Sequence, residues 1–221
     1  MTETRPLIAA RPFMPPGLQG TQGTGPGAPL SPYGAAHVLD ASECMALIRL
    51  MDTAETRAGG LSGGRADSRI RQADSLWLDG DGPIPGLSAR LARLVAAANR
   101  DWFMFDLDGM DEGIQLIRYR AGAEPAPEQA TTEGDHYDWH VDVGRAGLAR
   151  GRKLSLSLQL PHPSAYDGGQ LLLNMAGYPS AAPTGQGAAT LFPAYSPHAV
   201  TPVTRGVRHA LVTWVQGPPF R

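Results

Sequence analysis

The sequence SPHAVTPVTRGVR at residues 196–208, taken together with YDWHVD at residues 137–142, decides how this chain is organised. The Tyr, Trp and Val of the second stretch favour an extended strand. On a strand, residues i and i+2 point to one face about 6.6 Å apart, so His140 and Asp142 are close enough to share a metal ion. His198 offers a second imidazole, and Arg208 follows it along the chain. These four residues form the predicted site.

The residue types of this set indicate a particular chemistry. Two imidazoles and one carboxylate on one side of a metal, with the other positions open, are the arrangement of non-haem Fe(II) oxygenases. The guanidinium of Arg208 would supply a two-pronged donor for the carboxylate of a co-substrate. A His-x-Asp pair is a weak signal by itself in a chain with six histidines, so the prediction rests on the whole set.

His136 raises competing interpretations of the metal strand. In a regular strand, residues 136, 138, 140 and 142 share one face, but residue 136 lies about 13 Å from residue 140, too far for a common metal. A zinc pair of His136 and His140 would need a helix here and a Glu after the first His, which is absent. We interpret His136 as a residue of the site mouth or surface. The remaining histidines, His37, His162 and His209, are predicted to be structural.

Length and composition bound the class of protein. A chain of 221 residues with 42% hydrophobic residues and a formal charge of -2 can form one soluble domain with a sizeable core. There is no basic excess that would indicate nucleic acid, and no apolar run approaches the roughly 18 residues that span a bilayer. The N-terminus lacks the apolar stretch of a signal peptide. Cys44 is the single cysteine, interpreted as a core thiol, so we expect a reducing, cytoplasmic setting.

The pattern along the chain predicts helices first and strands afterwards. Residues 1–36 are rich in Pro and Gly and are expected to be partly flexible, which leaves residues 37–221 as the domain. Asp40 and Glu43 form a capping box that begins a short helix, and apolar spacing predicts an amphipathic helix from Pro85 to about Asn99. Strands are expected at 70–78, 103–105, 114–119, 153–160, 170–173, 188–192 and 209–215.

Two stretches are expected to be loops, and the element order sets the fold class. The Gly-rich stretch 58–68 is a flap or a connector, and the loop 120–135 leads into the metal strand. Helices followed by many short strands indicate an α+β fold, with an antiparallel sandwich or jelly roll buttressed by N-terminal helices.

Several motifs together resemble the Fe(II)- and 2-oxoglutarate-dependent dioxygenases. Within these, the chain is most similar to the prolyl 4-hydroxylase-like group, and especially to the PKHD-type hydroxylases. The likeness covers about residues 110–217, while residues 37–109 match only in general character. The motifs are Tyr137-x-x-His140-x-Asp142, Tyr166-Asp167-Gly168-Gly169, the run from His198 to Arg208, and Trp214-Val-Gln216.

The resemblance implies a double-stranded β-helix, or jelly roll, with the N-terminal helices packed on one sheet. It implies that iron is held by His140, Asp142 and His198, that Arg208 pairs with the distal carboxylate of 2-oxoglutarate, and that O2 takes a remaining position. It also implies that Tyr119 points towards the co-substrate, with Ser155 and Ser157 as further contacts. Two departures stand out: Gln170 occupies the place of a family Glu, and the loop 120–135 is longer than usual.

The resemblance implies hydroxylation of an unactivated C–H bond, with succinate and CO2 as co-products. The expected substrate is a protein or peptide side chain, as in prolyl hydroxylases, with a free amino acid or small metabolite as the alternative. No nucleic-acid or membrane partner is expected, and the oligomeric state stays open. A hypothesis of another class is a non-catalytic β-sandwich binding module with a structural metal. Such a metal is usually held by four protein ligands, often including Cys.

Overall fold

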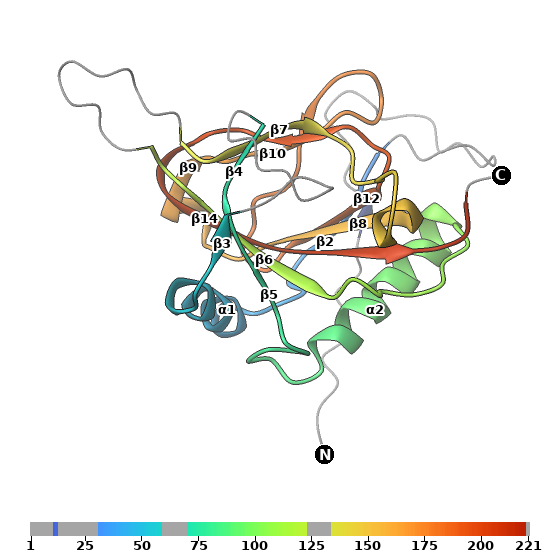
Figure 1. Ribbon diagram of the computed structural model, residues 1–221, viewed down its shortest axis with the longest axis horizontal. Helices are drawn as coiled ribbons and strands as arrows, with labels where there is room; N and C mark the ends of the chain where they lie inside the picture. The colour runs from blue at the N-terminus through green and yellow to red at the C-terminus, as the bar shows by residue number, and fades with distance from the viewer. Residues whose placement is uncertain (1–10, 13–30, 59–69, 123–133, 220–221) are drawn as a thin grey trace.

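The computed structural model describes residues 11–12, 31–58, 70–122 and 134–219. Two antiparallel sheets face each other, and α1 and α2 cover the outer face of the larger sheet (Figure 1). The expected α+β fold, a double-stranded β-helix or jelly roll with N-terminal helices packed on one sheet, is confirmed.

The larger sheet provides the floor of the molecule and the smaller sheet its roof in the view of Figure 1. In the larger sheet the order is β1 (Arg11–Pro12), β2 (Tyr33–Ala35), β12 (Ala189–Pro193), β8 (Arg152–Gln159), β14 (Val203–Gln216), β6 (Ile114–Arg120), β5 (Asp74–Trp77) and β3 (Arg57–Ala58), and β9 (Tyr166–Gly168) also pairs with β14. In the smaller sheet it is β11 (Ser180–Ala181), β10 (Leu171–Leu173), β13 (His198–Val200), β7 (His136–His140) and β4 (Arg71–Gln72). Strands β1 and β2 therefore bring two parts of the Pro/Gly-rich segment 1–36 into the larger sheet.

Helix α1 (Ala41–Thr53) begins at the predicted capping box. The Asp40 carboxylate accepts a hydrogen bond from the Glu43 backbone N–H at 2.9 Å, and the Glu43 carboxylate accepts one from the Asp40 N–H at 2.9 Å. These two bonds satisfy backbone donors that the first turn of a helix leaves unpaired. The sequence signal and the local structure agree here because the box is built from four consecutive residues.

Helix α2 (Leu87–Ala98) begins at Gly86 and takes its cap from a preceding turn. The Asp81 carboxylate accepts from the backbone N–H groups of Gly86 and Ser88, both at 2.8 Å. The helix then passes into a single π-helical turn, η1 (Asn99–Phe103). Among the described residues, no helix has the length and apolar character needed to cross a bilayer.

Two of the strands predicted from the sequence, at residues 103–105 and 70–78, differ from the structure. Residues 103–105 form no strand, because the Asn99 side chain donates to the Phe105 carbonyl at 2.8 Å and accepts from the Phe105 N–H at 2.9 Å. The side chain thereby satisfies backbone groups that a neighbouring strand would otherwise pair. The stretch 70–78 is split at the buried Ala73: β4 pairs with β7 in the smaller sheet, and β5 pairs with β6 in the larger one.

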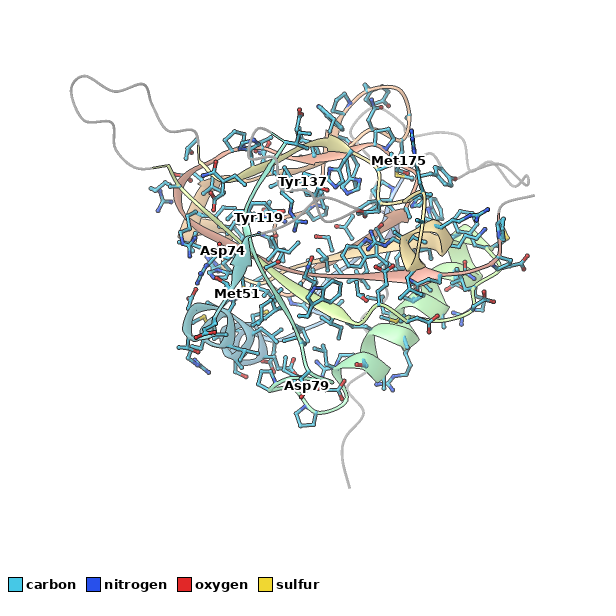
Figure 2. All side chains as sticks on the ribbon, viewed as in Figure 1. Met51, Asp74, Asp79, Tyr119, Tyr137 and Met175 are labelled. Atoms are coloured by element: carbon cyan, nitrogen blue, oxygen red, sulfur yellow. The ribbon has the colours of Figure 1, made fainter. Side chains whose placement is uncertain are left out.

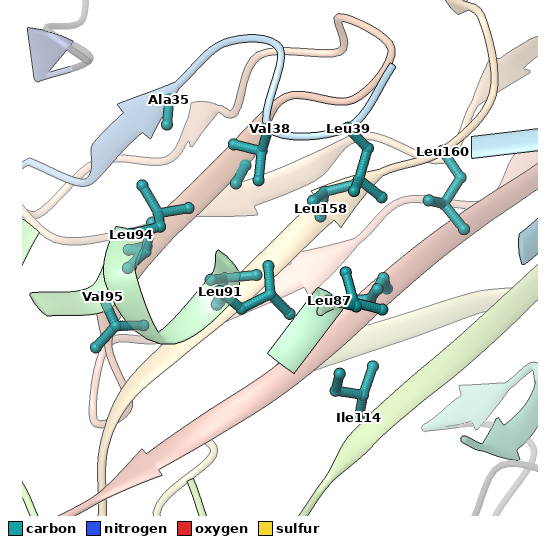
Figure 3. Packing of buried hydrophobic residues seen from close by; sticks show 14 of the residues in the cluster. Ala35, Val38, Leu39, Leu87, Leu91, Leu94, Val95, Ile114, Leu158 and Leu160 are labelled. Atoms are coloured by element: carbon teal, nitrogen blue, oxygen red, sulfur yellow. The ribbon is translucent and has the colours of Figure 1, made fainter. Parts of the chain in front are cut away.

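The main hydrophobic core lies between the helices and the outer face of the larger sheet. Figure 3 shows the apolar stripe of α2, from Leu87 to Val95, packed against side chains of the sheet such as Leu158 and Ile114. Cys44 belongs to this core, where burial raises the pKa of its thiol to about 12. A thiol with so high a pKa stays protonated, which agrees with the prediction of a core residue. Because the helices seal this face, the opposite face of the larger sheet is left for the site.

Candidate active site

A cavity of about 860 Å³ lies between the two sheets. Its floor includes side chains of β5, β6, β8 and β14 in the larger sheet, and its roof includes side chains of β4, β7, β10 and β13 in the smaller one. Figure 2 shows Tyr119 and Tyr137 in this space, one on the floor strand β6 and one under β7. Lining residues that matter below are Tyr119, Tyr137, His140, Asp142, Arg152, Ser155, Ser157, His198, Arg208 and Trp214.

Strand β7 carries a β-bulge that re-aims its side chains. Tyr137 is opposite Val200 and His140 is opposite His198, so three steps on β7 match two steps on β13. The extra residue brings Tyr137 and His140 to the same face, where their rings stack with centroids 3.4 Å apart and planes 13° apart. The expectation that residues 136, 138, 140 and 142 share one face is therefore wrong.

Asp142 lies just beyond the end of β7, in the segment that follows His140. The predicted strand geometry for this pair is thus wrong in detail, yet the side chains converge. Asp142 Oδ1 lies 3.8 Å from His140 Nε2, and Asp142 Oδ2 lies 3.5 Å from His198 Nε2. One ligand atom from each residue lies within 4.8 Å of the other two. The structure therefore brings together the three residues predicted as metal ligands.

The hydrogen bonds of the two imidazoles determine which nitrogen carries the proton. His140 Nδ1 lies 2.8 Å from the Asp138 carbonyl oxygen, and His198 Nδ1 lies 3.0 Å from the Ser196 carbonyl oxygen. A carbonyl can only accept, so each Nδ1 carries a hydrogen, and in the neutral form of either ring Nε2 then turns a lone pair towards Asp142. Burial, followed by the nearby His198, lowers the pKa of His140 below its ordinary value, which keeps that ring neutral. In the neutral forms of both rings, three acceptors converge, which is an arrangement suited to a cation.

The carboxylate of Asp142 is held ionised and in place. Its burial favours a raised pKa, but His198, His140 and the side chains of Ser155 and Trp214 together lower the pKa below its ordinary value. The Ser155 hydroxyl donates to Asp142 Oδ2 at 2.6 Å, so this hydroxyl holds the carboxylate. Two neutral imidazoles and one carboxylate are a donor set that fits Fe(II) with positions left open.

A buried ion pair supports the Asp142 backbone, and nothing in the sequence points to it. Arg152 Nη1 donates to the Asp142 carbonyl at 3.1 Å, and Arg152 Nε donates to a Glu112 carboxylate oxygen at 2.6 Å. The Arg152 guanidinium carbon lies 3.8 Å above the Trp214 ring, and the Gln216 amide donates to Glu112 at 2.7 Å. Glu112 and Arg152 are 40 residues apart and match no local pattern, so only the tertiary structure reveals the pair.

Arg208 is buried on the cavity face of β14, opposite Tyr119 of β6 in the sheet register. Its guanidinium carbon lies 5.4 Å from the centroid of the Tyr119 ring. Tyr119, Ser155 and Ser157, the other residues predicted to contact a co-substrate, line the same cavity. A permanently charged guanidinium in this position can receive a carboxylate through two parallel hydrogen bonds.

The remaining histidines of the described chain lie apart from this cluster. His209 points to the helix side, where its Nε2 lies 3.0 Å from Asp52 Oδ1, and His136 Nδ1 lies 3.1 Å from the Gly134 carbonyl oxygen. Most of the stretches 58–68 and 120–135, predicted as loops beside the site, lies outside the described residues.

Comparisons with known proteins agree with this geometry. A family model described as the 2OG-Fe(II) oxygenase superfamily matches residues 128–216. A PKHD-type hydroxylase of Synechococcus sp. is 30% identical over 183 residues, which cover 81% of this chain and 75% of that protein. A PKHD-type hydroxylase of Teredinibacter turnerae is 30% identical over 159 residues, which cover 67% of this chain and 70% of that protein.

Solved structures show the same fold. A Pseudomonas putida prolyl-4-hydroxylase superposes with a TM-score of 0.62 at 24% identity, over 83% of this chain and 91% of that one. A prolyl hydroxylase from Trichoplax adhaerens, in complex with a hypoxia inducible factor peptide fragment, gives a TM-score of 0.65 at 19% identity. The superposition covers 83% of this chain and 82% of that one. At these identities the likeness concerns the fold.

Proposed function

Since the chain belongs to the PKHD-type hydroxylases of the 2OG-Fe(II) oxygenase superfamily, we propose that His140, Asp142 and His198 hold its Fe(II) and that Arg208 binds the distal carboxylate of 2-oxoglutarate. One observation carries the proposal: three acceptor atoms converge within 4.8 Å in a cavity that Arg208 also lines. A site with three protein ligands differs from a structural metal site, which is usually closed by four. The set of three ligands therefore argues against a binding module with a structural metal.

The residues of the chain prepare this site for bound metal and co-substrate. When bound, Fe(II) with 2-oxoglutarate and O2 converts a substrate C–H to C–OH while 2-oxoglutarate becomes succinate and CO2. The Asp138 and Ser196 carbonyls hold a proton on each Nδ1, so each ring in its neutral form presents Nε2 to the metal. Tyr137 stacks on the His140 ring and limits its rotation. These contacts hold the ligands in place before the metal binds.

We propose a protein or peptide side chain, of the prolyl type, as the substrate. The cavity reaches the molecular surface at Trp77, which lines it and is 48% exposed, so a side chain carried on another protein can enter. A tryptophan exposed at a cavity mouth offers an apolar surface on which a saturated ring such as that of proline can pack. The peptide-bound prolyl hydroxylase of Trichoplax adhaerens, which shares the fold, supports this choice.

The metal assignment is tested by two histidine variants of the same strand. His140→Ala removes a proposed ligand, and His136→Ala is the matched control four residues away on β7. We expect succinate formation from 2-oxoglutarate to fall by about 1,000-fold or more in the first variant, since a lost metal ligand removes the metal-dependent step. The control should stay within about threefold of the wild type. Retained succinate formation in His140→Ala would refute the assignment.

The co-substrate assignment is tested on two arginines of strand β14. Arg208→Ala should weaken 2-oxoglutarate binding about a hundredfold, because it removes a buried charge-assisted donor pair. Arg205→Ala, which breaks an exposed pair with Asp167, should leave 2-oxoglutarate binding unchanged. Equal affinities in the two variants would contradict the role of Arg208.

The substrate class is tested with Fe(II)-loaded protein, 2-oxoglutarate and a panel of proline-containing peptides beside free proline. Mass spectrometry should find a single added oxygen atom on a peptide prolyl residue, in proportion to the succinate formed. Oxygen added to free amino acids but to no peptide would favour the small-metabolite alternative. Variation at Trp77, for example Trp77→Ala, should raise the KM for the peptide more than that for 2-oxoglutarate, since it removes the proposed entrance surface.

A further inference from the structure

Gly169, which has no side chain, packs against the Arg208 side chain on the side away from the large cavity. A Cβ atom placed on Gly169 would lie 2.9 Å from Arg208 Cδ and 2.9 Å from Val203 Cγ2. Carbon atoms pack at about 3.5–4.0 Å, so the stem of Arg208 occupies the room that any other residue at 169 would need. Gly169 also has a φ of +58°, a conformation that residues with a Cβ rarely adopt. The absence of a Cβ atom and the positive φ together allow the backbone of residue 169 to lie against the aliphatic part of the Arg208 side chain.

The head of Arg208 is held by a second pair of residues. The Tyr166 hydroxyl is hydrogen-bonded to the Arg208 side chain and also accepts from the Gln159 amide. Tyr166 and Gln159 are 5% and 6% exposed, so water does not compete for these bonds. A hydroxyl oxygen has two lone pairs, which allows it to accept from both donors at once.

Little empty space remains on this side of the guanidinium. The gap lined by Ser157, Gln159, Tyr166, Gly169 and Arg208 has a volume of about 10 Å³ among the described residues. A water molecule needs roughly 10–15 Å³ of such volume, so the gap holds at most one water. On the cavity side the Tyr119 ring lies 5.4 Å from the guanidinium carbon. Arg208, a side chain with many rotamers, therefore has little room to move away from the cavity.

We propose that Gly169, Tyr166 and Gln159 are positioning residues that set how far the Arg208 guanidinium stands from the metal ligands, and that this distance selects a five-carbon 2-oxo diacid. The inference rests on the proposed roles of Arg208 and of the three metal ligands. A co-substrate that chelates the metal at one end and meets Arg208 at the other must match the distance between them. Hydrogen bonds weaken steeply away from their preferred length and angle, so one methylene more or fewer costs affinity.

The proposal makes opposite predictions for two kinds of change. Adding a methyl group at residue 169 should push Arg208 towards the metal ligands and favour a shorter diacid. Removing the support at Tyr166 should let Arg208 retreat and favour a longer one. A purely structural role for these residues would instead weaken binding of all diacids by the same factor.

The experiment measures binding by calorimetry to the full chain loaded with Mn(II), without oxygen, using oxaloacetate, 2-oxoglutarate and 2-oxoadipate. For Gly169→Ala we expect about tenfold weaker 2-oxoglutarate binding and a shift of about fivefold or more in the ratio of affinities towards oxaloacetate. For Tyr166→Ala the ratio should shift towards 2-oxoadipate. Tyr166→Phe, which keeps the ring and loses one hydrogen bond, should weaken 2-oxoglutarate about fivefold.

A matched control separates backbone strain from the proposed effect. Gly80 has a φ of +57°, and a Cβ placed on it would meet nothing within 4 Å, so Gly80→Ala carries the strain of Gly169→Ala without the contact with Arg208. Gly80→Ala should bind all three diacids as the wild type does. If Gly169→Ala does not fold, the ratio of affinities for the three diacids in the Tyr166 variants and in Gln159→Leu tests the positioning role.

Two outcomes overturn the inference, and they are distinguishable. Affinity ratios that stay at the wild-type value in the variants of residues 169 and 166 would refute the positioning role while leaving the proposed function intact. A wild-type protein that binds Mn(II) but not 2-oxoglutarate would refute the proposed role of Arg208, and this inference with it.

Discussion

The two faces of strand β14 show how one strand serves both packing and chemistry. Side chains at 208, 210, 212 and 214 line the cavity, while those at 209, 211, 213 and 215 point to the helices. On the helix side, Leu211 and Val215 are buried in the core. On the cavity side, Arg208 and Trp214 are placed for ligands or for the groups that hold them. The alternation of a strand thus separates the two tasks by a single residue.

Charged groups are treated differently on the two faces. On the helix face, Arg118 donates to Asp52 at 3.0 Å and to Asp74 at 2.8 Å, and His209 contacts Asp52 at 3.0 Å. Donors meet acceptors there, so that network can contribute to stability. At the proposed metal site three acceptors face one another, an arrangement that is unfavourable until a cation binds. The convergence of like groups therefore distinguishes the proposed metal ligands from the complementary pairs found elsewhere on both faces.

The largest effect is expected from breaking the ion pair between Glu112 and Arg152, which should lower both the stability of the protein and its affinity for metal. Glu112→Ala would leave the Arg152 guanidinium buried without its carboxylate, at a cost of about 3–5 kcal/mol in the free energy of unfolding. Because Arg152 also supports the Asp142 carbonyl, Mn(II) affinity should fall about 10–100-fold. Urea unfolding and metal titration measure the two effects.

The matched control for this prediction is an ion pair of similar geometry at the surface. Arg205 and Asp167 lie 2.6 Å apart with side chains 57% and 61% exposed. Asp167→Ala should change the free energy of unfolding by less than about 1 kcal/mol, since water screens the pair. If Glu112→Ala and Asp167→Ala lowered the free energy of unfolding by equal amounts, burial would not be the reason for the effect of the first pair.

A smaller effect on the free energy of unfolding is expected when the same substitution, Val→Ala, is made on each face of β14. Val215→Ala removes two methyl groups from the core, where Val215 is 2% exposed, and should cost about 1–3 kcal/mol. Val212→Ala, three residues away on the cavity face, removes the same atoms from a wall that is only half-buried, and should cost less than about 1 kcal/mol. Thermal and urea unfolding compare them. A Val212→Ala cost as large as that of Val215→Ala would show that the cavity wall is packed as tightly as the core.

The elements that sequence predicts well are those whose signals are local. The capping box at Asp40, the spacing of α2 and the alternation of β8 each depend on residues within a turn or a strand of one another. The split of residues 70–78 between two sheets and the turn held by Asn99 depend on distant partners or on one side chain, so periodicity could not reveal them.

The site follows the same rule. His140, Asp142, His198 and Arg208 could be predicted because their residue types and order carry the chemistry. Their geometry could not be, since the bulge on β7 appears only when β13 pairs with it. Gly169 and Tyr166 stand in a motif visible in the sequence, but their contact with Arg208 comes from the packing of β9 and the residue after it against β14.

The smallest expected effect is a pH dependence that belongs to the helix face. Burial lowers the pKa of His209 below its ordinary value, against the opposing pull of Asp52. The unfolded chain therefore takes up a proton at a higher pH than the folded one does. The contribution of His209 is fully present above about pH 6.5 and declines as the pH falls below that value, by at most about 1.4 kcal/mol per pH unit for one proton. Asp52 acts in the same direction at lower pH: burial would raise its pKa, but His209 and Arg118 lower it overall, so its contribution is lost on acidification.

The variant His209→Gln tests this, because an amide can still donate to Asp52 but does not titrate. Urea unfolding of metal-free wild type and variant between pH 7.5 and 5.5 should show a difference in free energy that favours the wild type at the upper end and shrinks towards the lower end. Other titrating groups, including those of the proposed metal site, are common to both proteins and cancel in this difference. A difference that is constant with pH would show that His209 is as easily protonated in the folded chain as in the unfolded one, and the helix face would then contribute no pH dependence through this residue.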